Sequence, residues 1–254
     1  MRFRTMSATG SRIPERVRYP LSGGCVSGLA SLLSSEAWRA LVQQGRPRTC
    51  ARGEVLLRQG EEGTYVLLLT SGNVKIVRSE RDGREMVLAL RGPGEALGEI
   101  SAWDGSCRSA TVTAVSNCLV HIVSAEHFRR TVRRFGAEET VLRHALARLR
   151  EGEDVRADLA DLPAGERLVR LLLRLATALA PTDAGAPPVD LELSPEDLAR
   201  AAGLSRSAVA AELSRLRGRG LVRTGRRKVL LCDLPGLQTL ADQDRRSWND
   251  RMMG

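Results

Sequence analysis

The stretch GEISAWDGSCRSA, residues 98–110, holds a carboxylate, a guanidinium and a hydroxyl within an otherwise apolar segment. Glycine at position 98 lets the backbone approach a ligand closely. The N–H groups that follow, with Arg108 as the cation and Ser109 as a donor, can hold a phosphate. Glu99 is badly placed beside a phosphate unless it faces a hydroxyl, which the ribose 2′-OH of a 3′,5′-cyclic nucleotide supplies. The segment therefore predicts a cyclic-nucleotide site.

A structural alternative uses the same residues without a ligand. In that interpretation Glu99 and Arg108 form a satisfied ion pair inside a ligand-free barrel. Buried charges kept only for packing are expensive, because each must be removed from water. This cost favours the ligand-binding interpretation, and the two make different predictions about the partner of Glu99.

The charge of the chain points to a polyanionic partner. The 254 residues include 39 basic and 30 acidic side chains, a net charge of +9, and all the basic residues except Lys75 and Lys228 are arginines. Such an excess favours nucleic acid as partner, although arginine richness is also typical of a GC-rich genome. Five scattered cysteines without metal-ligand spacing indicate a reducing cytoplasm and no metal site. No apolar run is long enough to span a membrane.

The helices and strands that would position the site are indicated by changes in the spacing of apolar residues along the sequence. Residues 34–44 have helical spacing after a serine cap, and many short β-prone runs with glycine turns follow over residues 48–123. The fold class expected is α+β, with an N-terminal antiparallel β-barrel or jelly roll, a long dimerisation helix and a C-terminal winged helix-turn-helix. The expected domains are a disordered tail (1–28), the cyclic-nucleotide-binding barrel (29–136), the dimerisation helix (137–162) and the DNA-binding domain (163–254).

The long helix carries an apolar stripe that recurs at helical spacing. Its members are Val141, Leu142, Ala145, Leu146, Leu149, Val155 and Leu159. One helix of this length cannot bury such a stripe alone, so we expect it to pair with the same helix of a second copy. Packing against its own barrel is the alternative.

The C-terminal third has the signature of a DNA-binding domain. Ser194 caps a helix that starts with Pro195 and stops at Gly203, and Ser205 caps a second helix that runs to about residue 217. Two short helices joined by a tight turn form a helix-turn-helix, and residues 223–231 are typical of a wing. From Arg206 to Lys228, eight basic residues against one acid favour contact with DNA.

Together these motifs resemble the Crp/Fnr family of bacterial transcription regulators from about residue 29 to residue 241. The matching segments are RGEVLLRQGEEGTYVLLLTSGNVKIV, DGRE, RGPGEALGEISAWDGSCRSATVTA and LSPEDLARAAGLSRSAVAAELSRLRGRGLV. The resemblance implies that Glu99 binds the ribose 2′-OH and that Arg108 and Ser109 bind the cyclic phosphate. It also places backbone groups of Gly98, Ile100 and Ser101 at the ligand, and pairs Arg148 with the ribose-binding glutamate.

The chain departs from the family pattern in both functional halves. Where cAMP-responsive members carry a Thr-Ser pair for the adenine amine, an ungapped alignment puts Gly152 and Glu153. The Glu153 carboxylate could accept from an adenine amine or from guanine N1–H and N2–H, or it could be a solvated helix residue. In the DNA-reading helix Arg206 matches, but Ser207 and Ala211 replace a glutamate and an arginine, so the target sequence should differ from the common half-site.

The expected function is that of a homodimeric, cytoplasmic transcription regulator controlled by a cyclic nucleotide, with cAMP expected first and cGMP as the other possibility. The partners expected are palindromic double-stranded DNA, a second copy and RNA polymerase, with no membrane, no metal and no enzymatic activity. A DNA binder with a vestigial pocket is the alternative. The residues expected at DNA are Ser205, Arg206, Ser207, Ala211, Arg215, Arg226, Arg227 and Lys228.

Overall fold

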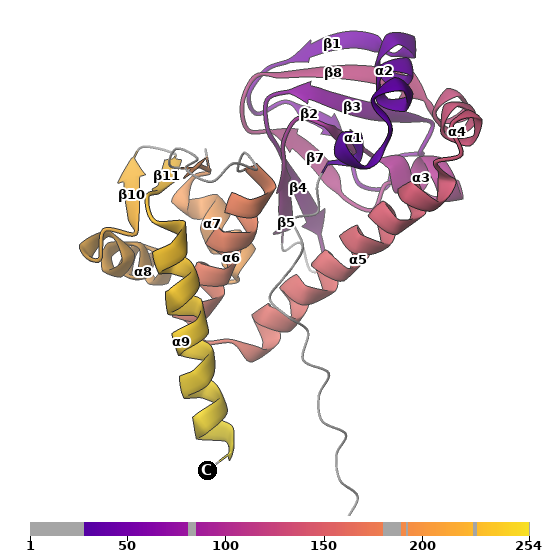
Figure 1. Ribbon diagram of the computed structural model, residues 1–254. Coiled ribbons are helices and arrows are strands. Elements are labelled where there is room, and N and C mark those ends of the chain that lie inside the picture. The colour runs from indigo at the N-terminus through magenta and orange to yellow at the C-terminus, as the bar shows by residue number, and fades with distance from the viewer. Residues whose placement is uncertain (1–27, 81–84, 180–188, 192, 226–227, 254) are drawn as a thin grey trace, which may run out of the picture.

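Two antiparallel four-stranded sheets face each other in the N-terminal half of the computed structural model (Figure 1). The structure describes residues 28–80, 85–179, 189–191, 193–225 and 228–253. The strands lie in the orders β1-β8-β3-β6 and β2-β7-β4-β5. They are β1 (Arg46–Cys50), β2 (Val55–Leu57), β3 (Tyr65–Ser71), β4 (Val74–Ser79), β5 (Glu85–Arg91), β6 (Glu95–Leu97), β7 (Thr111–Ala114) and β8 (Cys118–Ser124).

The space between the two sheets is filled by apolar side chains. Leu67 and Leu69 of β3, Val112 of β7 and Val120 of β8 are all buried in one cluster. These residues come from the β-prone runs of the sequence, whose side chains alternate between the two faces of a sheet. The predicted antiparallel barrel is confirmed.

Short helices cover one end of the barrel (Figure 1). They are α1 (Leu29–Leu32), α2 (Ser35–Gln44), α3 (Glu99–Asp104) and α4 (Ala125–Arg134). The side chain of Ser34 accepts a hydrogen bond from the Ala37 N–H at 3.1 Å, as the predicted serine cap requires. Leu41 of α2 and Phe128 of α4 pack into a second buried cluster together with Val66 and Val123 of the sheet. The helices therefore close the barrel end near the loop that holds Glu99.

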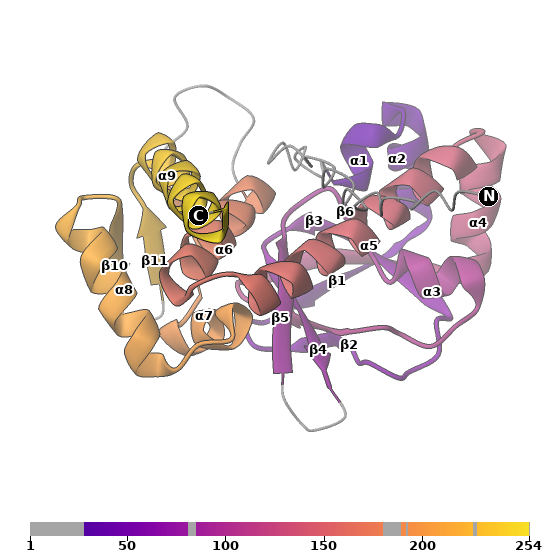
Figure 2. The same cartoon turned by 90° about the horizontal axis from the view of Figure 1, so that it is seen from below.

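Helix α5 (Glu138–Asp161) crosses beneath the barrel and leads to the C-terminal domain, as seen in Figures 1 and 2. Its extent agrees with the predicted helix over residues 137–162. The apolar stripe divides into two faces. Val141 and Val155 are buried, whereas Leu142, Leu146 and Leu149 are 53%, 42% and 57% exposed. Val141 packs into the cluster at the barrel end, as the alternative expects, whereas pairing of the exposed face with a second copy stays a prediction.

The C-terminal domain combines helices with a small antiparallel sheet in the order β10-β11-β9. Its elements are α6 (Ala164–Leu179), β9 (Val189–Asp190), α7 (Pro195–Ala202), α8 (Arg206–Gly218), β10 (Val222–Gly225), β11 (Lys228–Leu231) and α9 (Leu234–Met253). The long helix α9 was not anticipated from the sequence.

Helices α7 and α8 form the predicted helix-turn-helix. Ser194 and Asp197 make a reciprocal capping box at the start of α7, with the Ser194 hydroxyl accepting from the Asp197 N–H at 3.1 Å. Gly203 ends α7 with φ +59°, a left-handed conformation that favours glycine. Ser205 then caps α8 by accepting from the Ala208 N–H at 3.1 Å.

Strands β4 and β5 contact the C-terminal domain directly (Figures 1 and 2). Val77, Val87 and Leu90 belong to the same buried cluster as the apolar residues of α6 and α7. Two ion pairs flank this contact: Lys75 Nζ lies 2.6 Å from Asp197 Oδ1, and an Arg200 guanidinium nitrogen lies 3.0 Å from Glu85 Oε2. One apolar cluster therefore spans the contact between the two domains.

Several sequence predictions concern residues that the structure does not describe. The predicted tail, apart from Gly28, and the two arginines expected at the wing tip, Arg226 and Arg227, lie outside the described residues. Most of the predicted linker over residues 181–190 does so as well. Within the described part of the chain, no helix is both long enough and apolar enough to cross a membrane.

Candidate functional site

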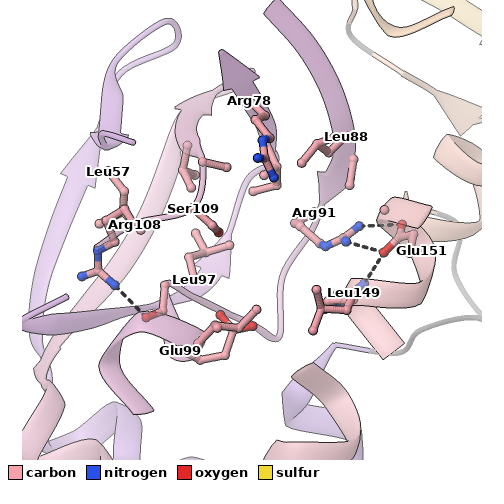
Figure 3. Close-up of a pocket in the computed structure, with 18 of the residues that line it drawn as sticks. Leu57, Arg78, Leu88, Arg91, Leu97, Glu99, Arg108, Ser109, Leu149 and Glu151 are labelled. Atoms are coloured by element: carbon pink, nitrogen blue, oxygen red, sulfur yellow. Dashed lines mark hydrogen bonds and ion pairs between the residues drawn. The ribbon is translucent and has the colours of Figure 1, made fainter. Parts of the chain in front are cut away.

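A cavity of about 210 Å³ lies between the β4–β5 side of the barrel, the loop of residues 98–110 and helix α5. Figure 3 shows Arg108 at one end, Glu99 and Leu149 on one side, and Arg78, Leu88 and Arg91 on the walls opposite. Every residue predicted for the cyclic-nucleotide site lines this cavity: Gly98, Glu99, Ile100, Ser101, Arg108, Ser109, Arg148 and Glu153. The fold thus brings the predicted set together from three separate segments.

The predicted phosphate-binding arginine is buried and held by the loop itself. One Arg108 Nη donates to the Gly98 carbonyl and to Ser101 Oγ, each at 2.6 Å, and the other donates to the Tyr65 carbonyl. Gly98 has φ +80°, and a Cβ there would lie 2.2 Å from the Arg108 guanidinium. Glycine is therefore required at this position by both conformation and space. Ser109 is exposed to the cavity.

Glu99 is a buried carboxylate, only 7% exposed, that forms no ion pair among the described residues, although Arg148 and Arg91 lie near enough to oppose the rise of its pKa in part. Burial raises its pKa to about 7, and the neighbouring Glu95 carboxylate adds to the effect. Among the described residues no ion pair joins Glu99 to Arg108, so the pair expected by the structural alternative does not form. A donor from outside the chain, such as a hydroxyl, would satisfy this carboxylate.

Arg148 does not pair with the glutamate that the resemblance implied. Its guanidinium instead binds the carboxylate of Glu95 and lies 3.2 Å from Glu151 Oε2. Arg91 holds Glu151 from the other side, with Nη–Oε distances of 2.5 and 3.2 Å. Glu95 also lies 3.9 Å from Arg91, so both arginines are engaged by it. The expected Arg148–Glu99 pair is thus replaced by a network of two arginines and two glutamates.

This network sets the ionisation of its members. Burial, together with a smaller contribution from the Glu151 carboxylate, raises the pKa of Glu95, and Arg148 and Arg91 counteract this rise only in part. Burial also opposes ionisation of Glu151, but Arg91 and Arg148 hold the pKa of Glu151 below its usual range. Burial, followed by Arg148 and Arg91, lowers the pKa of His144 to about 3, so this histidine is neutral at pH 7.

Sequence reasoning missed Arg78, Arg91, Glu95 and Glu151 as residues of the cavity. Glu151 carried a usable signal, because it follows Arg148 by three positions on one helix and must share its face. Arg78 carried a signal as well, because it follows Val77 on a predicted strand and must therefore point to the opposite face of the sheet. Arg91 and Glu95 gave no such signal in the sequence, because their contacts depend on how α5 packs against the barrel.

Glu153, predicted as the base-reading residue, lies at the open rim of the cavity. Its side chain is 67% exposed, and Oε1 accepts from an Arg156 guanidinium nitrogen at 2.5 Å. Gly152 lines the cavity beside it and has open space around its Cα. This end of the cavity is therefore charged.

The predicted DNA-binding residues of α8 share one exposed face. Ser205, Arg206, Ser207, Ala211 and Arg215 are all exposed, while Val209, Leu213 and Leu216 face the core. The Arg206 side chain is 75% exposed and pairs with Glu196 at 2.6 Å. Lys228 begins β11 and lies 3.6 Å from Asp190 Oδ2. No group of three or more His, Cys, Asp or Glu side chains suited to a metal ion occurs in the described ranges.

Two family models match the chain, each over one of the two domains. The cyclic nucleotide-binding domain covers residues 47–135, and the Crp-like helix-turn-helix domain covers residues 166–240. A cyclic-nucleotide-binding barrel joined to this DNA-binding module defines a class of bacterial transcription regulators. Individual relatives narrow that class further.

The chain is 30% identical over 208 residues to the CRP-like cAMP-activated global transcriptional regulator of Mycobacterium tuberculosis, spanning 82% of this chain and 93% of the relative. It is 32% identical over 207 residues to the cyclic AMP receptor protein of Thermus thermophilus, spanning 81% and 89%. A CRP-family regulator structure from Thermus thermophilus aligns with TM-score 0.60 and 27% identity, over 77% of this chain and 96% of that one. The chain belongs to the Crp/Fnr family of transcription regulators.

Proposed function

We propose that this chain is a homodimeric transcription regulator whose DNA binding is controlled by a 3′,5′-cyclic purine nucleotide. The cyclic phosphate would bind Arg108 and Ser109, the ribose 2′-OH would bind Glu99, and backbone groups of Gly98, Ile100 and Ser101 would complete that end. A regulator that acts on chromosomal DNA works in the bacterial cytoplasm. The names of two relatives, which refer to cAMP, support this class of effector.

The single observation that carries the proposal is the state of Glu99. It is a buried carboxylate with a raised pKa and no cationic partner in the described part of the chain, and it lines the cavity. A hydroxyl donor from a ligand would relieve this arrangement, since an unpaired buried charge is costly. A vestigial pocket would gain nothing from such a residue.

The charge of the cavity supports a monoanionic ligand. Its lining includes five arginines and four glutamates, which leaves one positive charge in excess when all are ionised. A cyclic mononucleotide carries one negative charge. Arg108 uses three of its five guanidinium N–H donors on Gly98, Ser101 and Tyr65, which leaves two donors for phosphate oxygens.

The open face of α5 supports a second copy of this chain as partner. Leu142, Leu146 and Leu149 recur at intervals of four and three positions and stay exposed. Such spacing fits an apolar seam between two helices. The seam runs beside the cavity, because Leu149 also lines it. Dimerisation would thus cover one side of the nucleotide site.

DNA would enter at the exposed face of α8, with one α8 from each subunit reading half of a palindromic site. Arg206 begins α8, and an arginine there can bond guanine O6 and N7. Its pairing with Glu196 must be released for that contact. Ser207 and Ala211 are too short to replace the longer side chains of other family members, so the site should differ from theirs. RNA polymerase is the expected second partner on DNA.

The proposal is tested by selecting an operator from random DNA and measuring its affinity with and without cyclic nucleotide. We expect cAMP or cGMP to tighten binding of the wild-type protein, and Arg108→Ala to remove this response. Loss of a charge-assisted contact with a buried anion weakens nucleotide binding by about 1.5–3 kcal/mol. Arg130→Ala, at an exposed position on α4, is the matched control. DNA affinity that ignores both nucleotides at millimolar concentration would instead support the vestigial-pocket alternative.

A further inference from the structure

The end of the cavity that remains for the base is built from charged groups. If the phosphate binds at Arg108 and the ribose at Glu99, the base must extend toward β4, β5 and α5. Figure 3 shows Arg78 and Leu88 on that side, with Leu149 and Glu151 on α5. Leu88 and Leu149 offer apolar surface for the faces of a planar ring. The polar edge of the ring would meet the charged side chains.

Arg78 is the cation of this end with donors to spare. It lies on β4, and its side chain extends into the cavity from the wall opposite Glu99 (Figure 3). Its side chain is 40% exposed, and its Nε forms an ion pair with Glu80 Oε1 at 3.4 Å without a hydrogen bond. Neither Nη group donates a hydrogen bond to another described residue. An arginine in this position can donate two parallel hydrogen bonds to a ligand.

Glu153 is the carboxylate of this end with accepting capacity to spare. Glu151 is already bound by Arg91 and Arg148, so its charge is compensated. Within the described residues Glu153 accepts one hydrogen bond, from Arg156 to Oε1. Its other oxygen and remaining lone pairs are open to a ligand.

The two purines differ in how they satisfy this pair of groups. Guanine presents N1–H and N2–H donors to a carboxylate, and O6 and N7 acceptors to an arginine. Adenine presents one N6 amine, whose neighbouring ring nitrogen N1 is an acceptor and repels a carboxylate. The adenine amine and the arginine guanidinium are both donors, so only adenine N7 can accept a hydrogen bond from the arginine. Each charged group thus finds two partners on guanine and one on adenine.

We infer that the cavity selects guanine, with Glu153 accepting from N1–H and N2–H and Arg78 donating to O6 and N7. The inference rests on the proposed function and assigns its effector as cGMP. A good bidentate contact discriminates between bases by about 5- to 150-fold. The chain would then differ in effector from its relatives named for cAMP.

The test is titration calorimetry of the full-length protein with cGMP, cAMP and cyclic IMP. We expect wild-type protein to bind cGMP at least 10-fold more tightly than cAMP. Cyclic IMP keeps O6 and N1–H but lacks the N2 amine, so its affinity should fall between the two. Arg78→Met should weaken cGMP more than cAMP, because adenine loses only one contact.

Glu153→Gln gives the sharpest arm of the test. A glutamine amide can accept from the adenine amine while it donates to N1, and it presents a donor to guanine N1–H, so the preference should move toward cAMP. Glu139→Gln is the matched control, since Glu139 lies on the same helix, is 80% exposed and also pairs with an arginine. It should leave all three affinities unchanged.

The outcomes separate this inference from the function on which it rests. Wild-type protein that binds cAMP as tightly as cGMP overturns guanine selection and leaves cyclic-nucleotide control intact. A cGMP preference that survives in Glu153→Gln overturns the assignment of the reading residue. Absence of binding for all three nucleotides overturns both the inference and the proposed function.

Discussion

Replacing Glu99 by glutamine should stabilise the ligand-free protein at neutral and alkaline pH. The carboxylate is buried, and its pKa is raised from 4.5 to about 7. Each tenfold change in proton affinity corresponds to about 1.36 kcal/mol, so the ionised form costs the folded state about 3 kcal/mol. Glutamine has nearly the same shape and no charge, so it would remove this cost.

The sign of the pH dependence follows from proton binding. The folded state holds the Glu99 proton more tightly than the unfolded chain does. Its stabilising effect is therefore complete below pH 4.5, declines as the pH rises and is lost above pH 7. Glu99→Gln should thus match wild type at pH 4.5 and exceed it by about 3 kcal/mol at pH 8.

Urea unfolding of wild type and variant at both pH values measures this difference. Trp38 and Trp103 lie in the barrel and report its unfolding by fluorescence. The same substitution should weaken cyclic-nucleotide binding, because a neutral amide accepts a hydrogen bond less strongly than a carboxylate. Glu126→Gln on α4, where the glutamate is 70% exposed, serves as control. An equal stability difference at pH 4.5 and pH 8 would refute the reasoning.

Three further predictions follow from other parts of the structure. On acidification from pH 7 to pH 5, the His144→Leu variant should lose about 2 kcal/mol less free energy of unfolding than wild type. The reason is that the unfolded chain protonates a histidine below pH 6.5, while folded His144 stays neutral down to about pH 3. Urea unfolding at both pH values measures this, and an equal loss in both proteins would contradict it. Lys75→Met removes the partly buried ion pair with Asp197 and should weaken the contact between the two domains by about 1 kcal/mol. Backbone amides of α7 should then exchange hydrogen faster, and an unchanged exchange rate would count against this prediction. Leu149→Glu should convert dimer to monomer in light scattering, and an unchanged mass would exclude the α5 seam.

The parts of the site that lie close together in the chain were predictable. Gly98, Glu99, Arg108 and Ser109 fall within one short segment, and all four line the cavity. The helix-turn-helix was predictable for a similar reason, because Ser194, Gly203 and Ser205 mark its ends by local backbone requirements. Local physics and a short motif sufficed in both cases.

What could not be predicted depends on how distant segments pack. Glu95 precedes Glu99 by only four residues, yet its capture of Arg148 depends on where α5 lies beneath the barrel. The stripe of α5 also could not be divided in advance, because Val141 and Leu142 have the same hydrophobic character in sequence. Their different exposure reflects which side the barrel covers.

The wall formed by β4 has a consequence for engineering the protein. Lys75 and Val77 face the C-terminal domain, whereas Ile76 and Arg78 line the cavity. At these four positions, the odd-numbered residues contact the DNA-binding domain and the even-numbered residues line the cavity. If the protein were used as a biosensor, substitutions at positions 76 and 78 should change which ligand it detects. Substitutions at positions 75 and 77 should change the ligand concentration at which the DNA-binding domain responds. Ligand specificity and the strength of the response could thus be adjusted separately on one strand.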